Sequence, residues 1–87
     1  MAIYKFNEDE VVKKLQSYID STYNKHYGTG KIQATEFVID SGHGEGFCVG
    51  NIIKYASRFG KKAGKNKLDI LKIIHYAVIL YSIDETD

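Results

Sequence analysis

The 87-residue chain contains no proline and no tryptophan, and it has a single cysteine, Cys48. One cysteine cannot form a disulfide within the chain, which excludes a disulfide-stapled secreted scaffold and indicates a reducing compartment. No apolar run approaches the roughly 20 residues needed to cross a bilayer. We also expect no signal peptide, because residues 1–9 lack a basic start followed by an apolar stretch. The sequence thus predicts one small cytoplasmic domain over residues 1–87, with no membrane contact.

The net charge is only +1, but the charges are unevenly placed. Residues 1–50 carry five Lys against seven Asp or Glu, a balance of −2. Residues 51–72 carry six Lys and one Arg against Asp69, a balance of +6, and residues 73–87 have a balance of −3. A local excess of this size indicates an anionic partner, with phosphate as the first candidate. For residues 60–67 alone, a solvated lysine-rich loop is an equal alternative.

Apolar residues recur at helical spacing in four segments, so the sequence predicts an all-α fold. We expect a small bundle of about four short helices over residues 8–23, 31–41, 47–59 and 68–83. A strand remains an alternative for residues 31–41, because Val38 and Ile39 are β-branched. The glycine-rich stretch 41–46 predicts a mobile turn. Gly60 is expected to end the helix over 47–59, and Asn66 is expected to cap the last helix.

The last of these segments, residues 68–83, is apolar around nearly its whole circumference. A helix that is apolar all round is normally buried on all sides. Three other short helices cannot easily cover it within one subunit, and a chain this short has a marginal core. We therefore expect a homo-oligomer, either a dimer or a tetramer, assembled through the 68–83 helix.

One face of the predicted helix 47–59 carries the groups that would bind a phosphate ligand. Asn51, Lys54, Tyr55 and Arg58 stand at offsets of three and four, which places them together. Lys54 and Arg58 can each hold a phosphate, and Tyr55 can stack on a base. The alternative is that Tyr55 packs in the core while both cations are solvated. Lys61 lies just beyond the predicted end of the helix.

Other candidate residues give weaker signals. His26 and Tyr27 form a second polar–aromatic pair, although a lone histidine is more often a surface residue. Residues 60–66 are one residue short of a Walker A loop and follow a helix, so we expect no P-loop. Glu36 and Asp40, at i and i+4, are candidate metal ligands, but a solvated helix surface is the preferred interpretation. No spacing fits a catalytic nucleophile or a four-ligand zinc site, so no catalytic residue, metal or cofactor is expected.

Taken together, these residues resemble a widespread family of small phage proteins, whose domain was long catalogued as being of unknown function. The resemblance covers about residues 25–81 and departs from the family in its glycine turn and its strongly apolar last helix. Its elements are His26-Tyr27, Glu36 within Ala34–Asp40, Gly50-Asn51-x-x-Lys54-Tyr55-x-x-Arg58 and Leu68-x-x-x-Lys72-x-x-His75-Tyr76.

The resemblance implies a nucleotide ligand. Proteins that look like this include a phage nucleotide kinase without a P-loop and viral sponges, which are small oligomers that sequester cyclic dinucleotide signals of the bacterial CBASS defence. We expect a sponge that binds such a signal without cleaving it, in the cytoplasm of the infected host cell. The ligand-binding residues would then be Lys54, Arg58 and Lys61 on phosphates, Tyr27 and Tyr55 on bases, and His26 and Asn51 as polar contacts.

Two alternatives remain open at this point. One is a deoxynucleoside monophosphate kinase, in which Glu36 or Asp40 would hold magnesium. The other is a nucleic-acid-binding accessory protein, which we rank last because the acidic ends of the chain disfavour an extended polyanion.

Overall fold

The centre of the fold is an antiparallel pair of helices, α3 (Gly44–Arg58) and α4 (Lys67–Asp84). The structure is a computed structural model that describes residues 3–26, 31–61 and 64–84. The other two helices are α1 (Glu8–His26) and α2 (Lys31–Asp40). The described residues form four helices and no strand, which confirms the all-α prediction. The strand alternative for residues 31–41 is therefore wrong.

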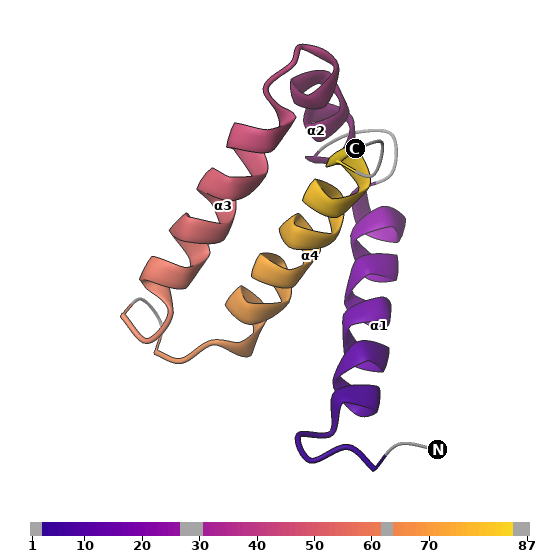
Figure 1. Ribbon diagram of the computed structural model, residues 1–87, viewed down its shortest axis with the longest axis vertical. Coiled ribbons are helices and arrows are strands. Elements are labelled where there is room, and N and C mark those ends of the chain that lie inside the picture. Colours follow the sequence, from indigo (N-terminus) through magenta and orange to yellow (C-terminus); the bar gives the residue numbers. More distant parts are fainter. Residues whose placement is uncertain (1–2, 27–30, 62–63, 85–87) are drawn as a thin grey trace.

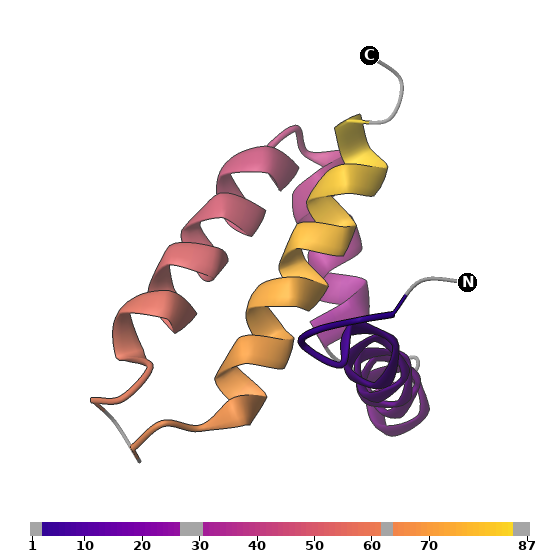
Figure 2. The ribbon, with the colours of Figure 1, turned by 60° about the horizontal axis from the view of Figure 1, so that its bottom comes forward.

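The helices are arranged around α4. Figures 1 and 2 show α3 and α4 running side by side, with α2 at the end where α3 begins and α4 finishes. α1 lies on the other side of α4 (Figure 1). Figure 2 shows α1 along its own axis while α4 is seen from the side, so the two helices cross at a steep angle.

The turn between α2 and α3 is shorter than the sequence predicts. Gly42 has a φ of 91°, which a glycine adopts without strain, and its N–H donates to the carbonyl of Ile39. The N–H of His43 donates to the carbonyl of Val38, completing a Schellman motif at the end of α2. The predicted mobile turn over 41–46 is wrong in its second half, because α3 begins at Gly44 rather than Phe47.

The connection between α3 and α4 has the predicted end signals. Gly60 follows α3 with a φ of 82°, and its N–H donates to the carbonyl of Gly64 over 3.0 Å. Asn66 Oδ1 accepts a hydrogen bond from the Leu68 N–H at 2.8 Å, which confirms the predicted cap of α4. These bonds close a short loop and bring the basic segment of the sequence to one end of the helix pair.

The core of this chain is small for its length. Cys48 is fully buried, as expected of a packing residue, and burial raises the pKa of its thiol. The radius of gyration is 14.3 Å, against about 12 Å for a compact domain of this length. The accessible surface is 6801 Å², against about 5,200 Å² for a typical monomer of this mass. The single chain is therefore more open than a self-contained domain.

Substitution of Gly44 tests the close packing of α3 against α2 and α4. A Cβ atom at this position would lie 2.9 Å from Ile83 Cδ1 and 3.3 Å from the backbone Cα of Ile39. We expect Gly44→Ala to lower the free energy of unfolding by about 1–3 kcal/mol, measured by urea denaturation. Gly50→Ala is the matched control within α3, because a Cβ there meets no atom within 4 Å. It should raise stability by about 0.5–1 kcal/mol, and equal effects at the two sites would contradict this packing.

Candidate functional site

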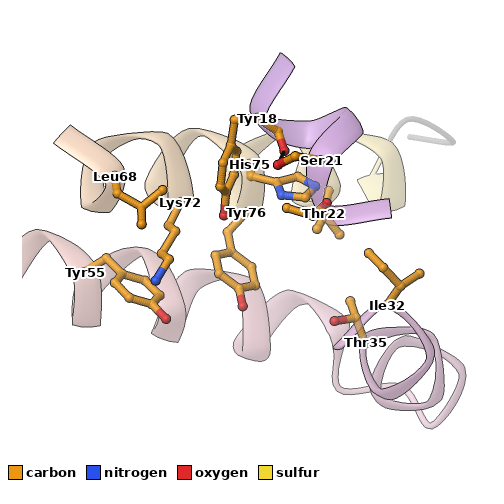
Figure 3. Close-up of a pocket in the computed structure, with 11 residues that line it drawn as sticks. Tyr18, Ser21, Thr22, Ile32, Thr35, Tyr55, Leu68, Lys72, His75 and Tyr76 are labelled. Atoms are coloured by element: carbon orange, nitrogen blue, oxygen red, sulfur yellow. Dashed lines mark hydrogen bonds between the residues drawn. The ribbon is translucent and has the colours of Figure 1, made fainter. Parts of the chain in front are cut away.

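A cavity of about 320 Å³ lies where the four helices approach one another. α4 contributes the largest share of its wall, with α1 on one side and α2 and α3 on the other (Figure 3). Its volume is at the lower end of the 300–1,000 Å³ typical of small-molecule sites. The lining residues are Tyr18, Ser21, Thr22, Ile32, Thr35, Tyr55, Leu68, Lys72, His75, Tyr76 and Ile79.

Aromatic rings make up much of this wall, and they are fixed by packing on one another. Tyr55 and Tyr76 stack with their ring centroids 6.2 Å apart and an interplanar angle of 14°. Phe47 meets Tyr76 edge-on, and Tyr18 meets His75 edge-on with centroids 5.9 Å apart. Such pairs are favourable beyond the area they bury, so the cavity has a preformed aromatic surface.

Three cations surround the ring of Tyr55 at one side of the cavity. Lys54 Nζ lies 4.8 Å from the ring centroid, Lys72 Nζ lies 4.9 Å away, and Arg58 Cζ lies 5.5 Å away. These distances are within the range of cation–π attraction. Within this cluster, Asp69 pairs with Arg58, which leaves two positive charges in excess. The local field therefore favours an anion beside the aromatic wall.

The Arg58–Asp69 pair ties the end of α3 to the start of α4. Asp69 is 1% exposed, and its Oδ2 lies 3.6 Å from Arg58 Nε. This separation is too long for a hydrogen bond, and neither atom has another hydrogen-bond partner among the described residues. A buried carboxylate without a counter-charge is strongly unfavourable, so Asp69 requires Arg58 in this position.

The structure brings Lys54, Tyr55 and Arg58 together, in the arrangement that their spacing on one helix predicts. Tyr55 is only 7% exposed, however, and one face of its ring packs on Tyr76. Tyr55 is therefore both a core residue, as the alternative interpretation predicts, and a member of the cavity wall. Arg58 shares its charge with Asp69.

Asn51 and Lys61, which were also predicted to bind the ligand, do not line the cavity. Asn51 donates a hydrogen bond from Nδ2 to the carbonyl of Phe47, one turn earlier in α3, at 2.9 Å. Lys61 is exposed in the loop after α3. His26 is the last residue of α1, and Tyr27 lies outside the described residues.

Sequence patterns gave little indication of several lining residues. Lys72, His75 and Tyr76 belong to the family resemblance, and their spacing of three and four places them on one side of α4. Tyr18 and the hydroxyl residues of α1 and α2 had no such signal, because their place in the wall depends on how α1 crosses α4. His75 lines the cavity and is half-buried.

Burial changes the protonation of the cavity wall. Desolvation lowers the pKa of His75 below its ordinary value of 6.5, so the imidazole is neutral near pH 7. Desolvation raises the pKa of Tyr18 and of Tyr76, with a smaller contribution from the neighbouring Tyr55. The described part of the wall therefore presents neutral hydrogen-bonding groups together with the charged Lys72.

The acidic candidates of α2 lie elsewhere. Glu36 and Asp40 are exposed and are not among the lining residues. Across residues 3–26, 31–61 and 64–84, no three His, Cys, Asp or Glu side chains are grouped as a metal site would require. Over the same ranges, no helix combines the length and the apolar character that crossing a bilayer demands.

Comparison with known proteins identifies the family. Residues 21–78 match the family described as a protein of unknown function, DUF3310, and this chain belongs to that family. The match covers nearly the same stretch as the resemblance in the sequence, about residues 25–81. Comparisons with curated proteins and with solved structures gave no match.

The Arg58–Asp69 pair predicts unequal effects of removing its two members. Arg58→Gln leaves a buried carboxylate without a counter-charge, and we expect it to lower the free energy of unfolding by about 3 kcal/mol. Asp69→Asn should cost less, about 1–2 kcal/mol, because the Arg58 side chain is 32% exposed and can reach water. Denaturant titration measures both, with the exposed Lys61→Gln as control. A larger loss for Asp69→Asn would contradict the asymmetry.

His75 predicts a pH dependence of stability. Because the folded state lowers the pKa of His75, the unfolded state takes up this proton first as pH falls below about 6.5. The free energy of unfolding should therefore decrease between about pH 7 and about pH 5.5, and His75→Gln should flatten that decrease. His43→Gln is the control, because His43 is exposed. An unchanged slope in His75→Gln would show that His75 is not the responsible group.

Proposed function

We propose that this protein binds a nucleotide in the cavity between the four helices and holds it without converting it. The observation that carries the proposal is the aromatic wall with Lys72 beside the Tyr55 ring, next to Lys54 and Arg58. A nucleotide combines a flat base, which packs on aromatic side chains, with a phosphate, which pairs with cations. The cavity joins both requirements at one place.

The polar groups of the wall fit a base. Ser21 Oγ and Thr22 Oγ1 donate to backbone carbonyls of their own helix, Tyr18 at 2.6 Å and Ile19 at 2.7 Å. Their oxygens remain able to accept a hydrogen bond from an amino group of a base. Neutral His75 has one donor and one acceptor nitrogen. The phosphate would lie at the Lys72 side of the cavity, where the positive charge is in excess.

The size of the cavity accords with one nucleotide unit. A cyclic dinucleotide, the ligand that the resemblance implies, has two bases and two phosphates. One half would occupy the cavity, and the other would extend past Lys54 and Arg58 at its edge. We propose that the protein acts as a sponge for such a signal and thereby as a phage antagonist of the CBASS defence in the host cytoplasm.

The lining residues favour binding over phosphoryl transfer. A phosphotransferase of this kind would hold magnesium through a carboxylate near the phosphates. Among the described lining residues there is no carboxylate, and Asp69 is buried against Arg58. A partly enclosed cavity of this volume also suits a small ligand better than an extended nucleic acid strand.

Calorimetric titration with 3′,3′-linked cyclic dinucleotides tests the proposal. We expect binding at micromolar concentrations, with intact ligand recovered after the complex is denatured. Lys72→Met keeps the aliphatic stem and removes the charge, and it should weaken binding at least about tenfold. Lys14→Met is the matched control, because Lys14 is exposed on α1 and outside the cavity wall.

Three results would contradict the proposal. Absence of binding at micromolar concentrations would show that 3′,3′-linked cyclic dinucleotides are not the ligand. Recovery of a cleaved dinucleotide would indicate a hydrolase. Phosphorylation of a deoxynucleoside monophosphate by ATP, lost in Glu36→Gln, would establish the kinase instead.

A further inference from the structure

α4 has a second apolar face, which lies away from the cavity. Ile74, Ala77, Val78 and Tyr81 line a shallow surface there, and Tyr81 is 77% exposed. Residues 73–83 include no Asp, Glu, Lys or Arg. A solvated helix carries charged residues on its outer face, as α1 does with its Glu10–Lys13 ion pair. The outer face of α4 has the composition of a covered surface.

The surface area of the chain agrees with this composition. The accessible surface of 6801 Å² exceeds the expectation for a monomer of this mass by about 1,600 Å². This excess belongs to the whole chain, and Val78 and Tyr81, 46% and 77% exposed, contribute to it from the outer face of α4. A second copy seated on this face would bury part of that excess, and a specific pair needs about 1,200–2,000 Å² in total.

We propose that a second copy covers this face, with the two α4 helices packed antiparallel about a two-fold axis. The spacing along the face alternates between three and four residues, which is the heptad pattern of a two-helix seam. One set of seam positions holds Lys67, Ile74 and Tyr81, and the other holds Ile70, Ala77 and Asp84. This inference is independent of the nucleotide proposal.

The residue types at these positions select the antiparallel direction. A two-fold axis between positions 75 and 76 places Ile74 opposite the partner's Ala77 and Tyr81 opposite the partner's Ile70. Each layer then joins a larger side chain to a smaller one. The same register sets position 67, a lysine, opposite position 84, an aspartate. Parallel packing would instead oppose lysine to lysine, aspartate to aspartate and alanine to alanine, with like charges at both ends and a gap in the middle.

The proposed seam leaves the cavity open. Lys72, His75 and Ile79 line the cavity and lie on the opposite side of α4 from the seam, given 100° per residue. A dimer built in this way has one cavity per copy, each directed away from the interface. Closed two-fold pairing also accounts for the apolar face without creating an open-ended polymer.

Light scattering on the purified chain tests the pairing. We expect twice the chain mass of 9.9 kDa at micromolar concentration. Tyr81→Glu and Ala77→Glu should halve the observed mass while circular dichroism shows retained helix. Ile53→Glu is the matched control, because Ile53 is 62% exposed on α3 and outside the seam, and this variant should remain a dimer. A monomeric wild-type chain, or dissociation by Ile53→Glu alone, would overturn the proposal.

Cross-linking tests the direction. Under mild oxidation, the double variant Ile70→Cys, Tyr81→Cys should form disulfide-linked dimers, whereas Ile70→Cys alone should not. Cys48 is fully buried and does not interfere. A larger assembly that still cross-links between positions 70 and 81 supports the pair. Efficient cross-linking of Ile70→Cys alone would show parallel helices and overturn the antiparallel arrangement.

Discussion

The buried carboxylate of Asp69 is the constraint on which the rest of the site depends. It is 1% exposed at the first turn of α4, so it needs a counter-charge from a neighbouring element, and Arg58 at the end of α3 supplies it. Holding Arg58 there fixes the register of the α3–α4 pair. That register sets Tyr55 against Tyr76 and places Lys54 and Lys72 around the same ring. The charged side of the cavity is thus a consequence of one ion pair.

The sequence specified the elements better than it specified the site. Helical periodicity and the end signals at Gly60 and Asn66 are local properties, and the four helices follow from them. The cluster of Lys54, Tyr55 and Arg58 is also local, because residues three and four apart on one helix are neighbours. The glycine-rich pattern placed the start of α3 at Phe47 rather than Gly44, because the close approach of Gly44 to Ile39 and Ile83 is a tertiary contact that has no local signal.

The remainder of the cavity has no local signal. Tyr18, Ser21 and Thr22 line it because α1 crosses α4 steeply, and a crossing angle is decided by the packing of two helices rather than by either sequence alone. The burial of Tyr55 likewise depends on Tyr76, which lies 21 positions later in the chain. A pattern on one helix therefore identified the cations correctly as neighbours but did not define the rest of the cavity wall.

The even distribution of apolar residues around α4 has two physical sources. One side must pack on α3 and form the aromatic cavity wall, with His75 kept neutral by burial. The other side has neither a charge between positions 73 and 83 nor a covering element within the described chain. Because both sides are apolar, the hydrophobic periodicity of α4 shows no single preferred face. A helix lacks an amphipathic stripe when one side contacts its own subunit and the other contacts a second copy. The composition of α4 and the large accessible surface of the single chain therefore both support the proposed pairing of two copies.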